Sequence, residues 1–286
     1  MKKIIISFSL LLMFLSFCRA QAYTGRLIDE QGVPVEYANV GVVGKSIGTV
    51  TSRDGRFELE IPQERFSDSI RFSMIGYETV TLLVSDFVNR TNKTIVMKEK
   101  IYSIEPITIT ATTIRTMILG YDRANWQVVR LYPRDDSNNR GLEFGIILDP
   151  KRETVLLETL TLNEMFITKE GNDTTILYRL NLYKVNPRNN FENIMEKPVY
   201  IRAPKNITRF EIDISEHNFI IENKTLLTLE YIDDAPLTFS LHFRGGFPKP
   251  PDDSFFRRAS HSNWINTVCF GMSVKARIMQ KNFTQK

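Results

Sequence analysis

The chain has 286 residues, of which 42% are hydrophobic and 24% are charged, and this balance is typical of a folded globular protein. Its formal net charge is +4. Most of this excess lies at the N-terminus, because removing Lys2, Lys3 and Arg19 lowers the basic count from 37 to 34, against 33 acidic side chains. No basic cluster remains that can follow a phosphate backbone, so the composition argues against nucleic-acid binding.

The first 20 residues have the layout of a secretory signal peptide. A positive start, Met1–Lys3, precedes the apolar run Ile4–Cys18, and Ala20 and Ala22 supply small residues for cleavage. The run is shorter than the roughly 20 residues that span a bilayer. We therefore expect cleavage near Ala20, export to the periplasm or the outer-membrane surface, and no transmembrane span in the mature chain.

Two alternatives for the N-terminus are a retained anchor and a lipoprotein with lipid on Cys18. Lipidation is disfavoured because Phe17 stands where a small residue should precede the cysteine. Cys269 has no second cysteine in the mature chain, so no disulfide is expected. Its apolar neighbours Val268 and Phe270 favour a buried small hydrophobe over a reactive nucleophile.

Residues 21–98 alternate short apolar runs with turn signals, the pattern of an antiparallel β-sandwich. Asp29 and Gly32 mark one turn, Asp54-Gly55 is a strong hairpin signal, and Gly76 suits a left-handed position. Seven strands are expected, at residues 23–28, 37–43, 49–52, 56–61, 69–73, 78–84 and 94–97.

This module also carries a family pattern. The residues are Gly25-x-Leu27-x-Asp29-x-x-Gly32-x-Pro34, Ala38-Asn39-Val40, Gly48-Thr49, Asp54-Gly55-x-Phe57 and Ser73-Met74-Ile75-Gly76-Tyr77. They resemble the carboxypeptidase regulatory-domain-like modules, which are transthyretin-like or CnaB-like sandwiches. The resemblance implies a bacterial envelope protein and a scaffold without chemistry of its own. The zinc site of the peptidases belongs to a catalytic domain whose pattern this chain does not show.

Residues 99–113 are predicted to be a linker, because charged residues give way to a β-branched stretch at 104–113. The stretch 104–112 resembles the short box that contacts the energising protein in TonB-dependent outer-membrane receptors. No plug or barrel pattern follows it, so a linker with extended structure is favoured over a working box.

Residues 114–286 are predicted to form a second, jelly-roll-like β-sandwich. A short helix is expected at 114–125, followed by strands with alternating polarity. The inward positions are Ile176, Tyr178, Leu180, Leu182, Phe210, Ile212, Ile214, Leu227, Leu229, Tyr231, Phe239, Leu241 and Phe243. The outward positions are Arg179, Asn181, Glu211, Asp213, Thr228, Glu230, Ser240 and His242. The stretches 180–185, 198–200, 210–214 and 229–232 resemble jelly-roll-like domains of exported envelope proteins.

No catalytic residue, cofactor or metal site is predicted. The histidines His217, His242 and His261 lack partners at metal-ligand spacing, and no nucleophile elbow or phosphate-binding loop occurs. Adjacent carboxylates occur at 135–136, 233–234 and 252–253. They are typical of solvated turns, with Ca²⁺ ligation as the alternative.

Residues 243–264 are the candidate ligand-binding segment, because Gly and Pro are expected to keep it out of a regular sheet while aromatic and polar side chains alternate. The candidate ligand-binding residues are Phe247, Asp252, Phe255, His261 and Trp264. The alternative is a surface loop whose aromatic residues pin it to the core.

Together these features predict an exported, all-β, two-domain protein that is not an enzyme. The expected boundaries are 1–20 for the signal peptide, 21–98 for the first sandwich, 99–113 for the linker and 114–286 for the second sandwich. We expect a binding or accessory module for a polysaccharide or an envelope protein. The alternatives are a β-sandwich glycan hydrolase and an accessory component of a TonB-dependent receptor system.

Overall fold

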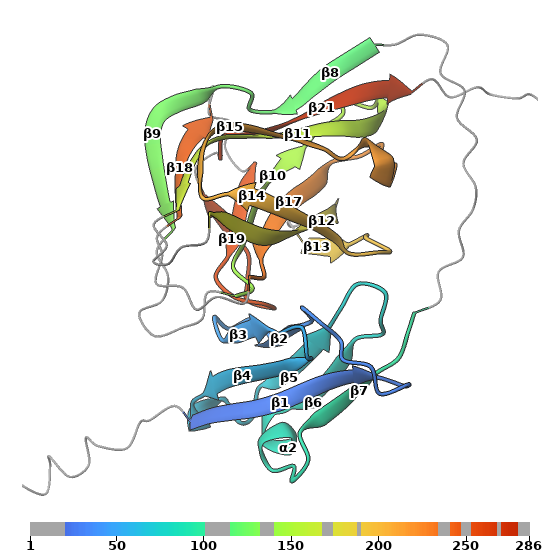
Figure 1. Cartoon of the computed structure of the whole chain (residues 1–286), viewed down its shortest axis with the longest axis vertical. Coiled ribbons are helices and arrows are strands. Elements are labelled where there is room, and N and C mark those ends of the chain that lie inside the picture. The colour runs from blue at the N-terminus through green and yellow to red at the C-terminus, as the bar shows by residue number, and fades with distance from the viewer. Residues whose placement is uncertain are drawn as a thin grey trace, which may run out of the picture.

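The computed structural model of the chain describes residues 21–100, 115–131, 140–167, 174–187, 190–233, 241–246, 253–267 and 270–279. The protein is nearly all β, with 59% strand and 6% helix, which confirms the predicted fold class. Two β units lie one above the other along the long axis (Figure 1). Among the described residues, no helix has the length and hydropathy that crossing a membrane requires.

The first unit is a sandwich of two small sheets with the strand orders β4-β1-β7 and β3-β2-β5-β6. All pairs are antiparallel except β1 with β7. The strands are β1 (Gln21–Asp29), β2 (Asn39–Val42), β3 (Gly48–Val50), β4 (Arg56–Ile61), β5 (Ser69–Ser73), β6 (Val80–Leu83) and β7 (Thr94–Met97). The 3-10 turn η1 (Gln63–Arg65) and the short helix α2 (Val84–Val88) complete the unit.

The core of this unit is an aromatic cluster between the two sheets. The rings of Phe57, Phe72 and Phe87 lie 5.8 to 5.9 Å apart, centre to centre. The predicted Asp54-Gly55 turn is present, with Gly55 at φ +76 and its carbonyl oxygen accepting from the amide of Leu27. A left-handed backbone of this kind favours glycine, which is why local sequence signals identify the turn.

The second unit contains two larger sheets. One has the strand order β13-β12-β17-β10-β19-β20, with β14 paired to β12, and the other has the order β8-β21-β11-β18-β9, with β15 and β16 paired to β11. Its first strands are β8 (Arg115–Gly120), β9 (Ala124–Leu131), β10 (Glu143–Leu148), β11 (Thr154–Ile167), β12 (Thr175–Asn186), β13 (Asn190–Asn193) and β14 (Val199–Pro204). The remaining elements are β15 (Asn206–Asp213), the 3-10 turn η3 (Ser215–His217), β16 (Ile220–Ile221), β17 (Thr225–Tyr231), β18 (Leu241–Gly246), β19 (Ser254–Arg257), β20 (Ile265–Thr267) and β21 (Met272–Met279).

The predicted helix at 114–125 is wrong. The structure places β8 and the start of β9 there, because β8 pairs with β21 and β9 pairs with β18. These partners lie more than 100 residues away, and long-range pairing overrides a weak local preference.

The alternation predicted for β12 and β17 is correct, but the expected exposure of their polar face is wrong. Tyr178 and Leu180 face the core, as expected. Arg179, Asn181 and Glu230 on the opposite face are also buried, with exposed fractions of 2%, 1% and 0%. The first unit contributes to their burial, since both the carbonyl oxygen of Tyr37 and the side chain of Asn39 accept hydrogen bonds from Arg179.

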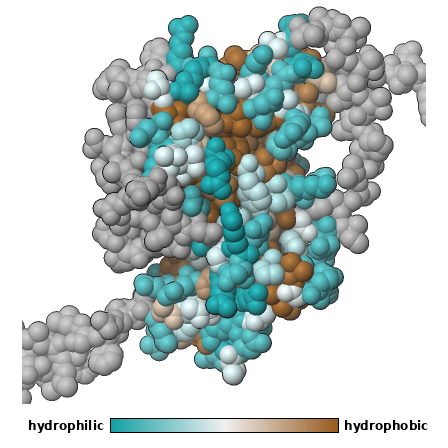
Figure 2. Space-filling model, viewed as in Figure 1, coloured by the Kyte–Doolittle hydropathy of each residue, from teal (hydrophilic) through white to brown (hydrophobic). Residues whose placement is uncertain are grey.

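The two units are in close contact at two glycines of the first unit. The backbone of Ser260 in the second unit lies so close to Gly41 that a Cβ there would overlap its carbonyl oxygen, and a Cβ on Gly48 would lie 2.5 Å from the same oxygen. The amide of Gly44 also donates to the carbonyl oxygen of His261 at 2.9 Å. On the face shown in Figure 2, hydrophilic side chains gather where the two units meet.

Candidate functional site

A groove of about 670 Å³ runs along the junction of the two units. The first unit contributes β5 and the turn that follows it, and the second contributes β12, β13 and β19. Characteristic lining residues are Arg71, Ser73 and Tyr77 from the first unit and Tyr183, Glu192 and Asn193 from the second. The groove therefore exists only where both units are in place.

A buried ion pair forms part of the groove wall. Nη2 of Arg179 lies 2.5 Å from Oε2 of Glu230, and Nη1 donates to the carbonyl oxygen of Tyr37 at 2.7 Å. Burial lowers the pKa of Arg179, but the adjacent Glu230 outweighs burial and raises that pKa above its usual value. The guanidinium thus ties the second unit to the main chain of the first.

A second buried pair joins β19 to β10. Nε of Arg257 donates to Oε2 of Glu143 at 2.7 Å, and Asn181 donates from Nδ2 to both Glu143 and Glu230 at 2.9 and 3.1 Å. The hydroxyl of Tyr183 donates to Glu143 at 2.9 Å, and burial raises the pKa of this tyrosine well above its usual value.

Glu143 and Glu230 are two buried carboxylates near this groove. A glycosidase needs two carboxyl groups that face one substrate bond across a cleft. Both side chains here are 0% exposed, each is ion-paired to an arginine, and neither lines the groove. Their geometry suits a structural network rather than acid–base chemistry on a bound sugar.

His261 sits in the groove wall opposite β5. Its Nε2 lies 3.3 Å from Oγ of Ser73, and its backbone has φ +62. Burial, together with the positive charges of Arg257 and Arg71, lowers the pKa of His261 to about 3. The imidazole is therefore neutral at ordinary pH.

The other residues of the predicted site do not gather in the groove. Phe255 is 3% exposed and packs in a small core cluster with Tyr183, and Trp264 is half-buried with its ring 4.8 Å from the guanidinium carbon of Arg257. Part of the predicted ligand-binding segment, residues 243–264, is regular strand, since β18 ends at Gly246 and β19 begins at Ser254. Phe247 and Asp252 lie outside the described residues, as does most of the predicted linker, residues 101–113.

Sequence reasoning identified one groove residue, His261, and missed the arginines. Arg179 and Glu230 were expected to face solvent, and neither Arg71 nor Arg257 was singled out. The sequence offered one clue to this pair. An arginine lies on one amphipathic strand and a glutamate on another, and each was expected on the polar face of its strand. Their pairing depends on the β12–β17 register, which local patterns do not supply.

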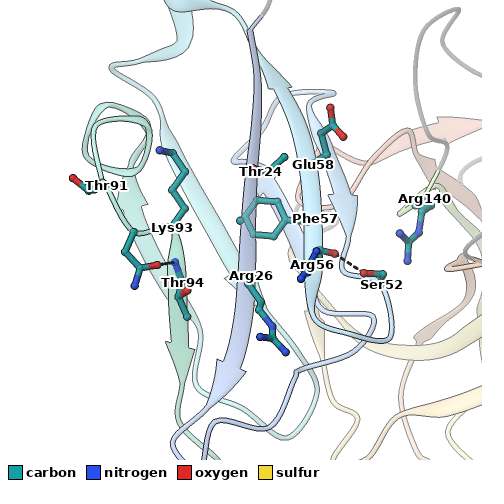
Figure 3. Close-up of a pocket in the computed structure, with 12 residues that line it drawn as sticks. Thr24, Arg26, Ser52, Arg56, Phe57, Glu58, Thr91, Lys93, Thr94 and Arg140 are labelled. Atoms are coloured by element: carbon teal, nitrogen blue, oxygen red, sulfur yellow. Dashed lines mark hydrogen bonds between the residues drawn. The ribbon is translucent and has the colours of Figure 1, made fainter.

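A second groove, of about 710 Å³, crosses the strands β4, β1 and β7 of the first unit (Figure 3). Its cations are held by neighbouring groups. Nε of Arg56 lies 3.1 Å from a carboxylate oxygen of Asp54, Nε of Arg26 donates to the carbonyl oxygen of Asp54, and Nζ of Lys93 donates to that of Arg90.

Metal binding receives no support from the described side chains, since no group of three or more His, Cys, Asp or Glu residues among them is placed to hold an ion. The groove is instead rich in hydroxyl, amide and aromatic side chains. Such groups recognise ligands by hydrogen bonding and ring stacking.

The similarity of this chain to curated proteins and to the solved structures named here is weak. Among curated proteins no match is found. The VP2 subviral particle of infectious bursal disease virus is 9% identical, with 91% of this chain and 66% of that chain covered and a TM-score of 0.21. The structure of the Gx strain of that virus is also 9% identical, with 92% and 63% covered and a TM-score of 0.20. Scores this low support no conclusion about fold or function.

Residues 23–109 match the family model of the CarboxypepD_reg-like domain, which covers the first sandwich and extends past its last strand. This match confirms the resemblance stated from the sequence. Over these residues the first unit is similar to the carboxypeptidase regulatory-like domains.

Proposed function

We propose that the protein is an exported, non-catalytic binding module of a bacterial cell envelope, and that its ligand is a polysaccharide chain bound in the groove at the junction. The observation that carries this proposal is the composition of the groove. Ser73, Thr79 and Thr81 from the first unit and Asn193 from the second line this groove. Hydroxyl and amide groups of this kind match the donor and acceptor pattern of sugar hydroxyls.

Aromatic side chains add to the fit. Tyr77, Tyr183 and Phe191 also line the groove. Aromatic rings bind the apolar faces of sugar rings, while neighbouring polar groups fix orientation. The regulatory-like nature of the first unit supports a role without catalysis. The signal-peptide pattern supports export to a compartment where polysaccharides are accessible.

Affinity electrophoresis of the mature chain in gels containing individual polysaccharides tests this proposal. We expect at least one polysaccharide to retard the protein, and Asn193→Ala to reduce the retardation while leaving the melting temperature close to that of the parent chain. Asn92→Ala, which alters the second groove, is the matched control and should migrate like the parent.

Retardation by no polysaccharide, combined with cross-linking of a single envelope protein in intact cells, would overturn the proposal in favour of a protein partner. Retardation that Asn92→Ala abolishes and Asn193→Ala leaves unchanged would move the site to the second groove.

A further inference from the structure

We infer that the groove at the junction takes an anionic saccharide, and that Arg71 on β5 binds its carboxylate or sulfate group. This inference rests on the proposed function and specifies its substrate class. Arg71 lies in the middle of β5, lines the groove and is half-buried.

Arg71 differs from the other arginines of the groove in its partners. Arg179 and Arg257 are ion-paired to Glu230 and Glu143. Within the part of the chain that the structure describes, no hydrogen bond or ion pair involves the Arg71 side chain, and its Nε is buried without a partner. Burying a guanidinium donor that has no acceptor costs free energy, so such a group is suited to a ligand that brings the acceptor.

The strands on either side of β5 supply no counter-charge. Arg71 pairs in register with Gly41 on β2 and with Thr81 on β6, and both are neutral. A planar guanidinium with free donors matches the two oxygens of a carboxylate, or the oxygens of a sulfate ester.

The charges of the residues that line the groove also favour an anionic ligand. Among its described lining residues, four are cationic, namely Arg71, Lys100, Arg179 and Arg257, while Glu192 is the one carboxylate. Glu192 is exposed, whereas Glu143 and Glu230 already neutralise two of the arginines from behind the wall. Burial is the main cause of the low pKa of His261, and the positive charges of Arg257 and Arg71 contribute to it.

The remaining lining residues fit the rest of such a ligand. Ser73 lies two residues along β5 from Arg71, so both side chains project from the same face of the strand. Ser73 and Asn193 can meet the hydroxyls of the sugar that bears the acid group. Neutral polysaccharides would satisfy these groups but leave Arg71 without an acceptor.

Calorimetric titration of the mature chain with three oligosaccharides of equal length tests the inference. The probes are an oligogalacturonate, its methyl ester, in which the charge is removed, and a sulfated oligogalactan. We expect the acid to bind more tightly than its ester, and the affinity for the acid to fall as salt is raised. The sulfated probe shows which anion is preferred.

Three variants assign the effect to Arg71. Arg71→Gln should weaken binding of the acid by about 10-fold to 100-fold, the range for a lost hydrogen bond to a charged group, and should leave binding of the ester unchanged. Arg71→Lys keeps the charge but loses the planar fork, so an intermediate affinity is expected. Arg56→Gln, in the second groove, is the control and should bind the acid like the parent chain.

The outcomes separate this inference from the proposed function. If acid and ester bind equally and Arg71→Gln changes neither affinity, the groove binds sugars but the inference about charge is wrong. If none of the three oligosaccharides nor any neutral polysaccharide binds, the proposed function itself fails. A lower melting temperature of Arg71→Gln, with affinity unchanged, would give Arg71 a purely structural role and would also overturn the inference.

Discussion

The guanidinium of Arg179 donates to the carbonyl oxygen of Tyr37 at 2.7 Å, so that a fully buried cation of the second unit binds the main chain of the first. Glu230 neutralises that cation from within the second unit. A buried ion pair gives little net stability but fixes one arrangement of the groups around it. This contact helps to set how the two units meet and therefore the shape of the groove between them.

Loss of the Arg179 side chain should be strongly destabilising. Arg179→Met leaves Glu230 buried without its cation, and breaking such a pair costs roughly 3–5 kcal/mol in the free energy of unfolding. Urea denaturation measures this loss. Arg209→Met is the control, because Arg209 pairs with Asp122 and Glu211 while 45% exposed, and pairs of this kind contribute roughly 0–1 kcal/mol. Equal losses in both variants would contradict the role assigned to Arg179.

Substitution of Gly41 should open the junction. In Gly41→Ala the added Cβ overlaps the carbonyl oxygen of Ser260, and overpacking of this kind costs about 1–3 kcal/mol. Hydrogen exchange at the amide of Gly44, which donates to His261 across the junction, should accelerate.

The control for this variant is Gly32→Ala, in a turn with no neighbouring atom within 4 Å of the new Cβ. Gly32 has φ +83, so the variant is strained locally and should lose stability without any change in exchange at Gly44. If both variants left Gly44 exchange at the parent rate, the close contact between Gly41 and Ser260 would not hold the units together.

Stability should fall as the pH drops below about 6.5, in part because of His261. Its folded-state pKa is about 3, below the usual value of 6.5, so the unfolded state takes up the proton first. The free energy of unfolding then decreases between these two values by up to about 1.4 kcal/mol per pH unit.

The measurement is the free energy of unfolding as a function of pH for the parent chain and His261→Asn, a residue that also tolerates positive φ. The variant should show a shallower slope between pH 3 and 6.5. Identical slopes for the parent and His261→Asn would show that His261 is not buried in its neutral form.

Phe255 and Trp264 should behave differently when truncated. Phe255→Ala removes a core side chain, and such changes cost about 3–5 kcal/mol. Trp264 is half-buried beside Arg257, Tyr183 and Phe191, so Trp264→Ala should cost less. Thermal unfolding of both variants checks this order. A larger loss for Trp264→Ala would make the indole, rather than Phe255, the anchor of this segment.

The first unit was predictable because its signals are local. Turns such as Asp54-Gly55 fix where strands begin and end, and β4, β5 and β7 have the predicted bounds. The segment at 114–125 was predicted as helix because its partners, β18 and β21, lie far along the chain. Local propensity carries no information about such pairing.

The candidate site was less predictable than the fold. The alternation of β12 correctly placed Arg179 opposite Leu180, but the burial of Arg179 depends on the first unit docking over that face. Arg71 gave no signal, because an arginine between Ile70 and Phe72 on a strand is normally a solvated residue. Its distinction, a buried donor without an acceptor, arises only from the tertiary structure.

The central claim is that the ligand binds between the two units. Hydrogen exchange of the mature chain, with and without a saturating acidic oligosaccharide, tests it most directly. We predict that the ligand protects peptides from β5 and from β13 at the same time, because both strands line the groove. Protection confined to peptides of β1, β4 and β7, or absent from one of the two units, would contradict a site at their junction.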